Sequence, residues 1–297
     1  MNNSHPKKLG SCLAFSFCLL HLCILLLTGC QTKNATNEKA DFPARDATLA
    51  RDSVLKSIRT SDVTNQLQFT AEVFNNGLLN DVDRVNDYIR RGKGVAAANL
   101  GIYLSDLSCL VALDKREEAV RYFDVCHRLS QYVGMEKQFE QAIQLGFNEI
   151  IAGDTELEKS LEHLFKDATN TTQQEEFKKL HGSALAGYYI EELYHLASYL
   201  KSHNSVNSGD SVFFVALKVF VNQKDELDNL ITYFDHVKLK SEGISAYQDL
   251  LALQAKYLAL DRDRLLHETN ASLLLQDKSL QDIFDSLISF RKRIIDS

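Results

Sequence analysis

Residues 44–297 contain no proline, and this absence constrains the fold more than any other feature of the sequence. The two prolines of the chain are Pro6 and Pro43. Proline lacks a backbone N–H and its ring clashes with the preceding turn, so it ends or bends helices. Ala, Leu, Glu, Lys and Gln are plentiful after Pro43, whereas strand-like runs of Val, Ile and Thr are missing. These preferences predict an all-α body.

Apolar residues recur at helical spacing along this body, and polar turns separate the segments. The short turn Asp114-Lys115 predicts that the two segments beside it form an antiparallel hairpin. The expected fold is a compact multi-helix array of such hairpins, with about ten to twelve helices. The predicted helices cover residues 44–59, 61–74, 78–91, 95–113, 116–133, 136–151, 154–168, 172–201, 211–222, 224–240, 244–260 and 280–295.

One segment of the body recurs in outline later in the chain. Residues 101–110 and residues 187–196 share a glycine, a tyrosine, an aliphatic residue, an acid and two leucines in register. A duplicated helical hairpin explains this likeness, and so does convergence of helices in one core. Gly101 and Gly187 each cost a helix about 1 kcal/mol relative to Ala, so we expect two helix backbones to approach closely there. The sequence has no 34-residue period, which excludes a strict tetratricopeptide array.

The first forty residues have the pattern of an export signal. Lys7 and Lys8 precede an almost continuous apolar run over residues 13–27, and no acid occurs before Glu38. A retained membrane anchor is the alternative, because residues 9–29 approach the length of about 20 apolar residues that spans a bilayer.

The residues that follow this run favour cleavage. Leu27-Thr28-Gly29-Cys30 resembles the lipobox of bacterial lipoproteins, in which small residues enter a narrow peptidase site and the cysteine sulfur receives diacylglycerol. The resemblance implies that Leu27, Thr28 and Gly29 are recognised by the signal peptidase and that residues 1–29 are removed. It also implies that Cys30 carries diacylglycerol and an N-acyl chain such as palmitate. Residues 30–43 are then a flexible tether, and residues 44–297 form the helical domain.

Lipidation of Cys30 predicts a location in the cell envelope, since two or more acyl chains make membrane attachment stable. Gln31, in place of Asp after the cysteine, favours the outer membrane over the inner membrane. The net charge of −7 and the pI of about 5.7 argue against a nucleic-acid partner, which requires a basic surface.

Acidic residues near the recurring segment are the candidate functional groups. Asp106 lies inside an apolar run, and a buried carboxylate needs a partner. We expect Asp106, Glu191 and Glu192 to form a buried polar or ligand site, with a structural role for Asp106. A di-metal helical bundle needs Glu-x-x-His twice, and Glu192-x-x-His195 is the one true copy, so no metal site is predicted.

Two cysteines remain in the body, Cys109 and Cys126, on the two arms of the predicted hairpin. A disulfide is possible in an exported protein, but two buried thiols are the favoured interpretation. No catalytic triad, nucleophile elbow, phosphate loop or zinc spacing occurs, so no catalytic residue is predicted.

Three stretches of the body resemble a family of uncharacterised, all-helical bacterial envelope lipoproteins. They are residues 76–80, 99–107 and 186–194, and the likeness runs over most of the chain from about Ser53. This copy departs from the family pattern at Tyr188, Tyr189 and Glu192. The resemblance implies an all-α fold and an envelope location, and it brings no activity.

Taken together, these features predict a non-enzymatic, membrane-anchored module that binds a protein or a ligand in the envelope. Its expected partners are membrane lipid, through Cys30, and an envelope protein. The expected cofactor content is none beyond the covalent lipid. The alternatives are a metal-binding helical bundle of the di-metal carboxylate type and a carrier of an apolar ligand.

Overall fold

The computed structural model describes residues 77–152, 157–170, 175–203, 211–236 and 245–296. All of them belong to the second of two compact units, Met1–Asp41 and Phe42–Ser297. The predicted leader, Cys30, the tether and the helices predicted over residues 44–59 and 61–74 lie outside the described residues. Within the described residues every regular element is a helix, which confirms the all-α prediction.

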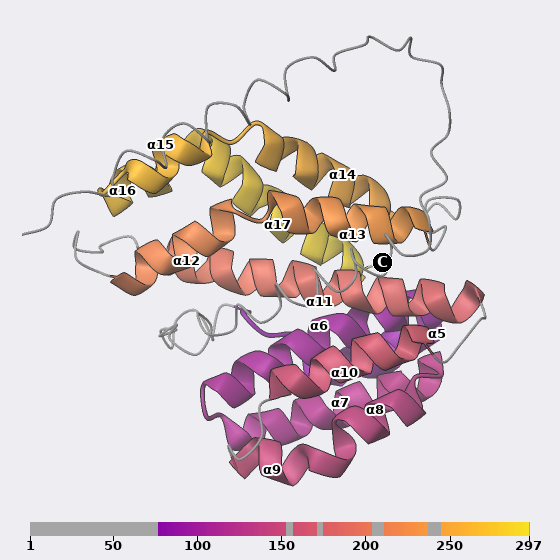
Figure 1. Ribbon diagram of the computed structural model, residues 1–297. Helices are drawn as coiled ribbons and strands as arrows, with labels where there is room; N and C mark the ends of the chain where they lie inside the picture. The colour runs from indigo at the N-terminus through magenta and orange to yellow at the C-terminus, as the bar shows by residue number, and fades with distance from the viewer. Residues whose placement is uncertain (1–76, 153–156, 171–174, 204–210, 237–244, 297) are drawn as a thin grey trace, which may run out of the picture. The chain divides into compact units, whose positions relative to one another are not determined.

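The described chain forms thirteen α-helices and two short 3₁₀ helices (Figure 1). In chain order they are η2 Val82–Arg84, α5 Val85–Arg91, α6 Lys93–Ala112, α7 Arg116–Val133, α8 Glu136–Ala142, η3 Gln144–Gly146, α9 Phe147–Ala152, α10 Leu157–Asn170, α11 Glu175–Ser202, α12 Ser211–Val221, α13 Lys224–His236, α14 Ser245–Leu258, α15 Arg262–His267, α16 Ala271–Leu275 and α17 Lys278–Asp296.

Two predicted helices are wrong in part. Residues 78–81 are not helical, because Asp81 caps η2 by accepting a hydrogen bond from the backbone N–H of Asp83. The helix predicted over residues 136–151 is interrupted, since Ile143 leaves the helical conformation at φ −122° and η3 separates α8 from α9.

Two short helices, α15 and α16, were not predicted at all. Each begins at a polar cap: the side chain of Asp261 accepts from the N–H of Arg264, and that of Asn270 accepts from Ser272 and Leu273. Helices of five or six residues are too short to show an apolar period, so sequence spacing does not reveal them.

Helices α6 and α11 form the centre of the domain. α6 packs against α5, α7 and α11, whereas α11 also contacts α10, α12, α13 and α17 (Figure 1). Within the described residues, α6 is the one helix long and apolar enough to span a membrane. Most of that apolar stretch is buried inside the domain. The predicted hairpin of α6 and α7 is confirmed, with the turn at Asp114 in the left-handed region at φ 54°.

The two central helices touch through their glycines. A Cβ atom at Gly101 would lie 1.8 Å from the carbonyl oxygen of Ala184, and one at Gly187 would lie 1.9 Å from that of Ala98. Each alanine lies three residues before the glycine of its own helix, so the two contacts are reciprocal. The close backbone approach predicted from the mid-helix glycines is confirmed. Duplication of a hairpin stays a prediction that this reciprocal packing favours.

The end of α17 is held by the start of the described chain. Arg84 and Arg91 donate to the carbonyl oxygen of Ile295 at 3.1 and 3.0 Å, and Asn99 donates to that of Ile294 at 3.2 Å. The last carbonyls of a helix have no partner within it, so these side chains satisfy groups that would otherwise need water. This contact fixes α17 against α5 and α6.

Candidate functional site

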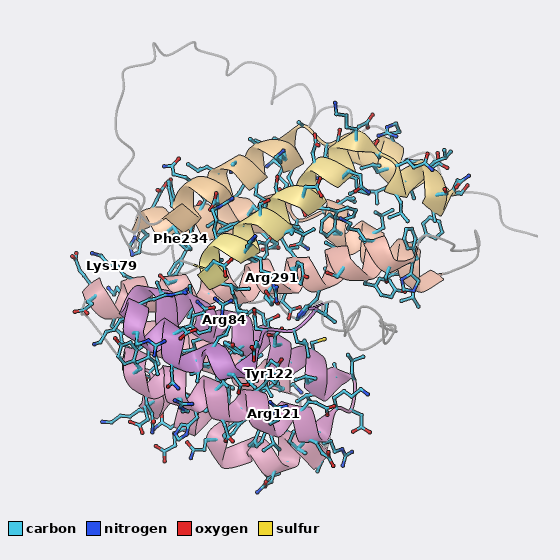
Figure 2. All side chains as sticks on the ribbon, turned by 180° about the vertical axis from the view of Figure 1, so that it is seen from behind. Arg84, Arg121, Tyr122, Lys179, Phe234 and Arg291 are labelled. Carbon is cyan, nitrogen blue, oxygen red and sulfur yellow. The ribbon has the colours of Figure 1, made fainter. Side chains whose placement is uncertain are left out.

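A buried cluster of charged side chains lies where α6, α11 and α17 meet the non-helical residues 77–80. α6 supplies Asp106, α11 supplies Glu191 and His195, and α17 supplies Arg291, which Figure 2 labels. Asp106 and Glu191 are fully buried, and His195 is 1% exposed. We refer to Asp106, Glu191, His195 and Arg291 as the buried cluster.

Asp106 is bound on both carboxylate oxygens. Its Oδ2 accepts from the backbone N–H of Asn80 at 3.0 Å and from the Asn80 side-chain amide at 3.2 Å. Its Oδ1 lies 3.1 Å from Nε2 of His195. The sequence predicts a buried site at Asp106, and Asn80 and His195 are the partners that satisfy this carboxylate.

Glu191 is bound by Arg291, whose Nε lies 2.7 and 2.9 Å from its two oxygens. The same guanidinium donates to the carbonyl oxygen of Leu78 at 3.3 Å and lies over the ring of Tyr194, 4.1 Å from its centroid. The Tyr194 hydroxyl donates in turn to the carbonyl oxygen of Gly77 at 3.3 Å. Arg291 therefore joins two helices to the segment that covers the cluster.

Glu192 was predicted to belong to the buried site, but the structure places it outside that site. It is partly exposed and accepts a hydrogen bond from the Ser105 hydroxyl at 2.9 Å. The acid beside His195 is Glu191, with Oε1 3.6 Å from Nε2 of the imidazole. The residue four positions before the histidine, rather than three, shares its helix face here, and the buried site is Asp106, Glu191 and His195.

Burial determines the protonation of the cluster. It raises the pKa of Asp106 to about 6, although Arg291 and the amides of Asn80 oppose the shift. It raises the pKa of Glu191 to about 7, where Arg291 opposes the shift and the nearby Asp106 adds to it. It lowers the pKa of His195. The imidazole is therefore neutral near pH 7 and donates from Nε2 to Asp106, while its buried Nδ1 has no hydrogen-bond partner among the described residues.

Cys109 and Cys126 are both buried free thiols, as the sequence analysis favoured. Burial raises the pKa of each thiol well above its usual value, and the nearby Asp106 raises both further. A thiolate is the reactive form of cysteine, so these side chains are packing residues rather than nucleophiles.

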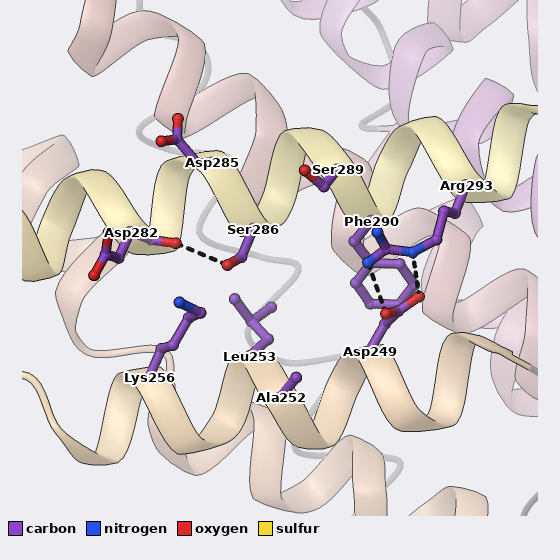
Figure 3. A pocket seen from close by; sticks show the side chains of 10 residues that line it. All are labelled: Asp249, Ala252, Leu253, Lys256, Asp282, Asp285, Ser286, Ser289, Phe290 and Arg293. Atoms are coloured by element: carbon purple, nitrogen blue, oxygen red, sulfur yellow. Dashed lines mark hydrogen bonds and ion pairs between the residues drawn. The ribbon is translucent and has the colours of Figure 1, made fainter.

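A second group of charges lies in a surface groove between α14 and α17 (Figure 3). The groove has a volume of about 300 Å³. At one end Arg293 binds both oxygens of Asp249 at 2.6 and 2.9 Å, and Ser286 donates to the Asp282 backbone carbonyl at 2.7 Å. No sequence motif marks this groove. Its lining residues are Asp249, Ala252, Leu253, Lys256, Asp282, Asp285, Ser286, Ser289, Phe290 and Arg293.

Comparison of the chain with protein-family models, with curated proteins and with solved structures finds no match. The resemblance to envelope lipoproteins therefore stays a prediction from the residues that carry it.

Proposed function

We propose that this chain is a lipid-anchored protein of the bacterial cell envelope whose helical body binds an envelope protein or a ligand without catalysing a reaction. One observation carries the proposal: Leu27-Thr28-Gly29-Cys30 ends an apolar run, and a polar segment then leads into a long helical body. Acyl chains on Cys30 fix such a body at a membrane surface, where its task depends on what the body contacts.

The charged groups of the body favour binding over catalysis. In the buried cluster, the carboxylates of Asp106 and Glu191 bind Asn80 and Arg291. Neither carboxylate lines the α14/α17 groove. A catalytic acid or base must reach a substrate, whereas groups bound in this way hold helices in register.

The α14/α17 groove is the proposed contact surface of the body. It displays both signs of charge, since Lys256 lies on α14 while Asp282 and Asp285 lie on α17. Leu253 and Phe290 lie beneath these charges and are almost fully buried (Figure 3). A polar surface of this kind suits a polar segment of a protein partner, because charged groups position a partner and select it.

The anchor is tested by mass spectrometry of the protein purified from membranes. We expect a mature N-terminal peptide that begins at lipid-modified Cys30. The Cys30→Ala variant is expected to retain residues 1–29 and to carry no lipid at position 30. A mature protein that retains residues 1–29, or a wild-type Cys30 without lipid, contradicts the proposal. Gln31→Asp tests the sorting: it should move the protein from the outer to the inner membrane fraction.

The contact surface is tested by placing a photo-reactive amino acid at Lys256 in the full chain and irradiating cells. A discrete cross-linked protein is expected from this position. The matched control is the exposed Glu117 on α7, from which the same product should be missing. Equal products from both positions, or none from Lys256, contradict binding at the groove.

A further inference from the structure

We propose that Asp106, Glu191 and His195 form a binding site for one divalent transition-metal ion, such as Zn²⁺. These residues offer one imidazole nitrogen and two carboxylate oxygens, and the three ligand atoms all lie within 4.8 Å of one another. Imidazole combined with carboxylate is a donor set that Zn²⁺, Fe²⁺ and Mn²⁺ accept in proteins. All three side chains are buried, unlike the exposed acidic groups that bind cations loosely at protein surfaces.

The distances fit a shared ion. Zn²⁺ binds nitrogen and oxygen at about 2.0–2.2 Å, so two ligands of a tetrahedral site lie about 3.4 Å apart. Nε2 of His195 is 3.1 Å from Oδ1 of Asp106 and 3.6 Å from Oε1 of Glu191. Both separations that involve Nε2 are within a few tenths of an ångström of this value, and the two carboxylate oxygens lie within 4.8 Å of each other.

The charges of the buried cluster also favour a cation. Two carboxylates face one guanidinium, that of Arg291. One negative charge is therefore uncompensated in the interior when both carboxylates are ionised, and such a charge is costly there. A divalent ion removes this excess. Arg291, which donates to both oxygens of Glu191, then acts as the supporting hydrogen-bond partner of a ligating carboxylate.

His195 can offer Nε2 to a metal ion once the proton that this nitrogen donates to Asp106 has moved. Its imidazole presents Nε2 to both carboxylates, and a neutral ring loses its Nε2 proton by moving it to Nδ1. Buried Nδ1 has no acceptor bound to it among the described residues, so it is free to take that proton. Metal binding is expected to strengthen as pH rises, because the ion binds deprotonated ligands.

The segment that covers the cluster defines the route of entry. Asn80 binds Asp106 through its backbone N–H and its side-chain amide, and it is not part of a helix. Displacement of Asn80 also releases its carbonyl oxygen from the Tyr122 hydroxyl, and it frees Oδ2 of Asp106 without unwinding α6, α11 or α17. Arg291 binds the carbonyl oxygen of Leu78 and Tyr194 binds that of Gly77, so these contacts can stay in place.

The test is titration of the full chain, stripped with a chelator, with Zn²⁺ and with Co²⁺. We expect one ion per chain and, with Co²⁺, visible absorption bands typical of four or five nitrogen and oxygen ligands. Asp106→Asn and His195→Gln remove one ligand each while keeping side-chain size. Each is expected to weaken binding by more than the roughly 10–100-fold that loss of a supporting partner costs.

Asp282→Asn is the matched control, since Asp282 is an exposed acid of the α14/α17 groove. It should leave affinity and Co²⁺ spectrum unchanged. Circular dichroism identifies variants that fail to fold. If a variant does not fold, the titration of the wild type still tests whether the chain binds one metal ion. Absence of stoichiometric binding by the wild type overturns the proposal, as does equal loss in Asp282→Asn or undiminished binding in both ligand variants.

Discussion

Arg291 and Arg293 lie two residues apart on α17, and each binds a carboxylate of another helix, yet their surroundings differ sharply. The Arg291 side chain is 12% exposed and meets the fully buried Glu191, whereas Arg293 is 50% exposed and meets Asp249, which is 18% exposed. Water and salt weaken an exposed ion pair, so its net contribution is about 0–1 kcal/mol. The same chemistry in the interior leaves an unpaired charge when one partner is lost.

The two arginines also differ in how many parts of the chain they join. Arg293 connects α17 with α14 alone. Arg291 connects α17 with α11 and with the carbonyl oxygen of Leu78, and it stacks on Tyr194. Position on the helix therefore decides whether an arginine makes one surface ion pair or links several elements of the fold.

The largest expected effect is that of Arg291→Met. Removing the guanidinium leaves Glu191 buried and unpaired, which is expected to lower the free energy of unfolding by about 3–5 kcal/mol. Urea denaturation at pH 8 measures this loss against a wild type whose Glu191, with a pKa of about 7, is mostly ionised. The double variant Arg291→Met/Glu191→Leu should recover much of the loss. A loss below 1 kcal/mol would remove the contrast with Arg293.

Glycine substitutions on α6 test the same contrast between buried and open positions. Gly101→Ala places a methyl group against the Ala184 carbonyl, so the helices must move apart at a cost of about 1–3 kcal/mol or more. Gly94→Ala on the same helix meets nothing within 4 Å and is expected to be neutral or stabilising by up to about 1 kcal/mol. Thermal unfolding of both variants checks this, and equal effects would contradict the close approach.

The pH dependence of stability is the next test of the buried cluster. Glu191 has its pKa raised from 4.5 to about 7, and Asp106 has its pKa raised from 3.8 to about 6. The folded state binds more protons than the unfolded state in these windows, so both contributions fall as pH rises through them. His195, with its lowered pKa, opposes this below pH 6.5.

Glu191→Gln isolates the contribution of one carboxyl group. Ionisation of Glu191 should make the free energy of unfolding of the wild type lower at pH 8 than at pH 5. This difference between the two pH values should be smaller in Glu191→Gln. An unchanged pH dependence in Glu191→Gln would show that Glu191 ionises in the folded protein as it does in water.

The smallest expected effect is that of Arg293→Ala. Its pair with Asp249 is partly exposed, so the loss is expected to be at most about 1 kcal/mol and to decrease in high salt. Urea denaturation at low and high salt measures it. A loss as large as that of Arg291→Met would mean that exposure does not separate the two pairs.

Single residues of the sequence indicate much of the fold but only part of the cluster. Gly101 and Gly187 revealed the central contact because glycine inside a helix needs a compensating gain. Asp106 was identifiable because an acid in an apolar run must find a partner.

The partners of Asp106 were harder to identify. Glu191 and Glu192 are adjacent acids on a helix that is buried nearly all round, so the apolar period does not show which of them faces inward. Arg291 stands in the basic run Arg291-Lys292-Arg293, 100 residues from Glu191, and local sequence does not separate the buried arginine from the exposed one. Asn80 binds Asp106 through its backbone N–H and its side-chain amide, and no local sequence pattern marks it.

The buried cluster also sets an order of events for a chain that emerges from the ribosome N-terminus first. Asp106 and Glu191 appear long before Arg291, because α17 is the last described helix. Until that helix is made, Glu191 lacks its guanidinium and the carbonyl oxygen of Leu78 lacks its arginine donor. The cluster can therefore be completed only when the last described helix packs against α6 and α11.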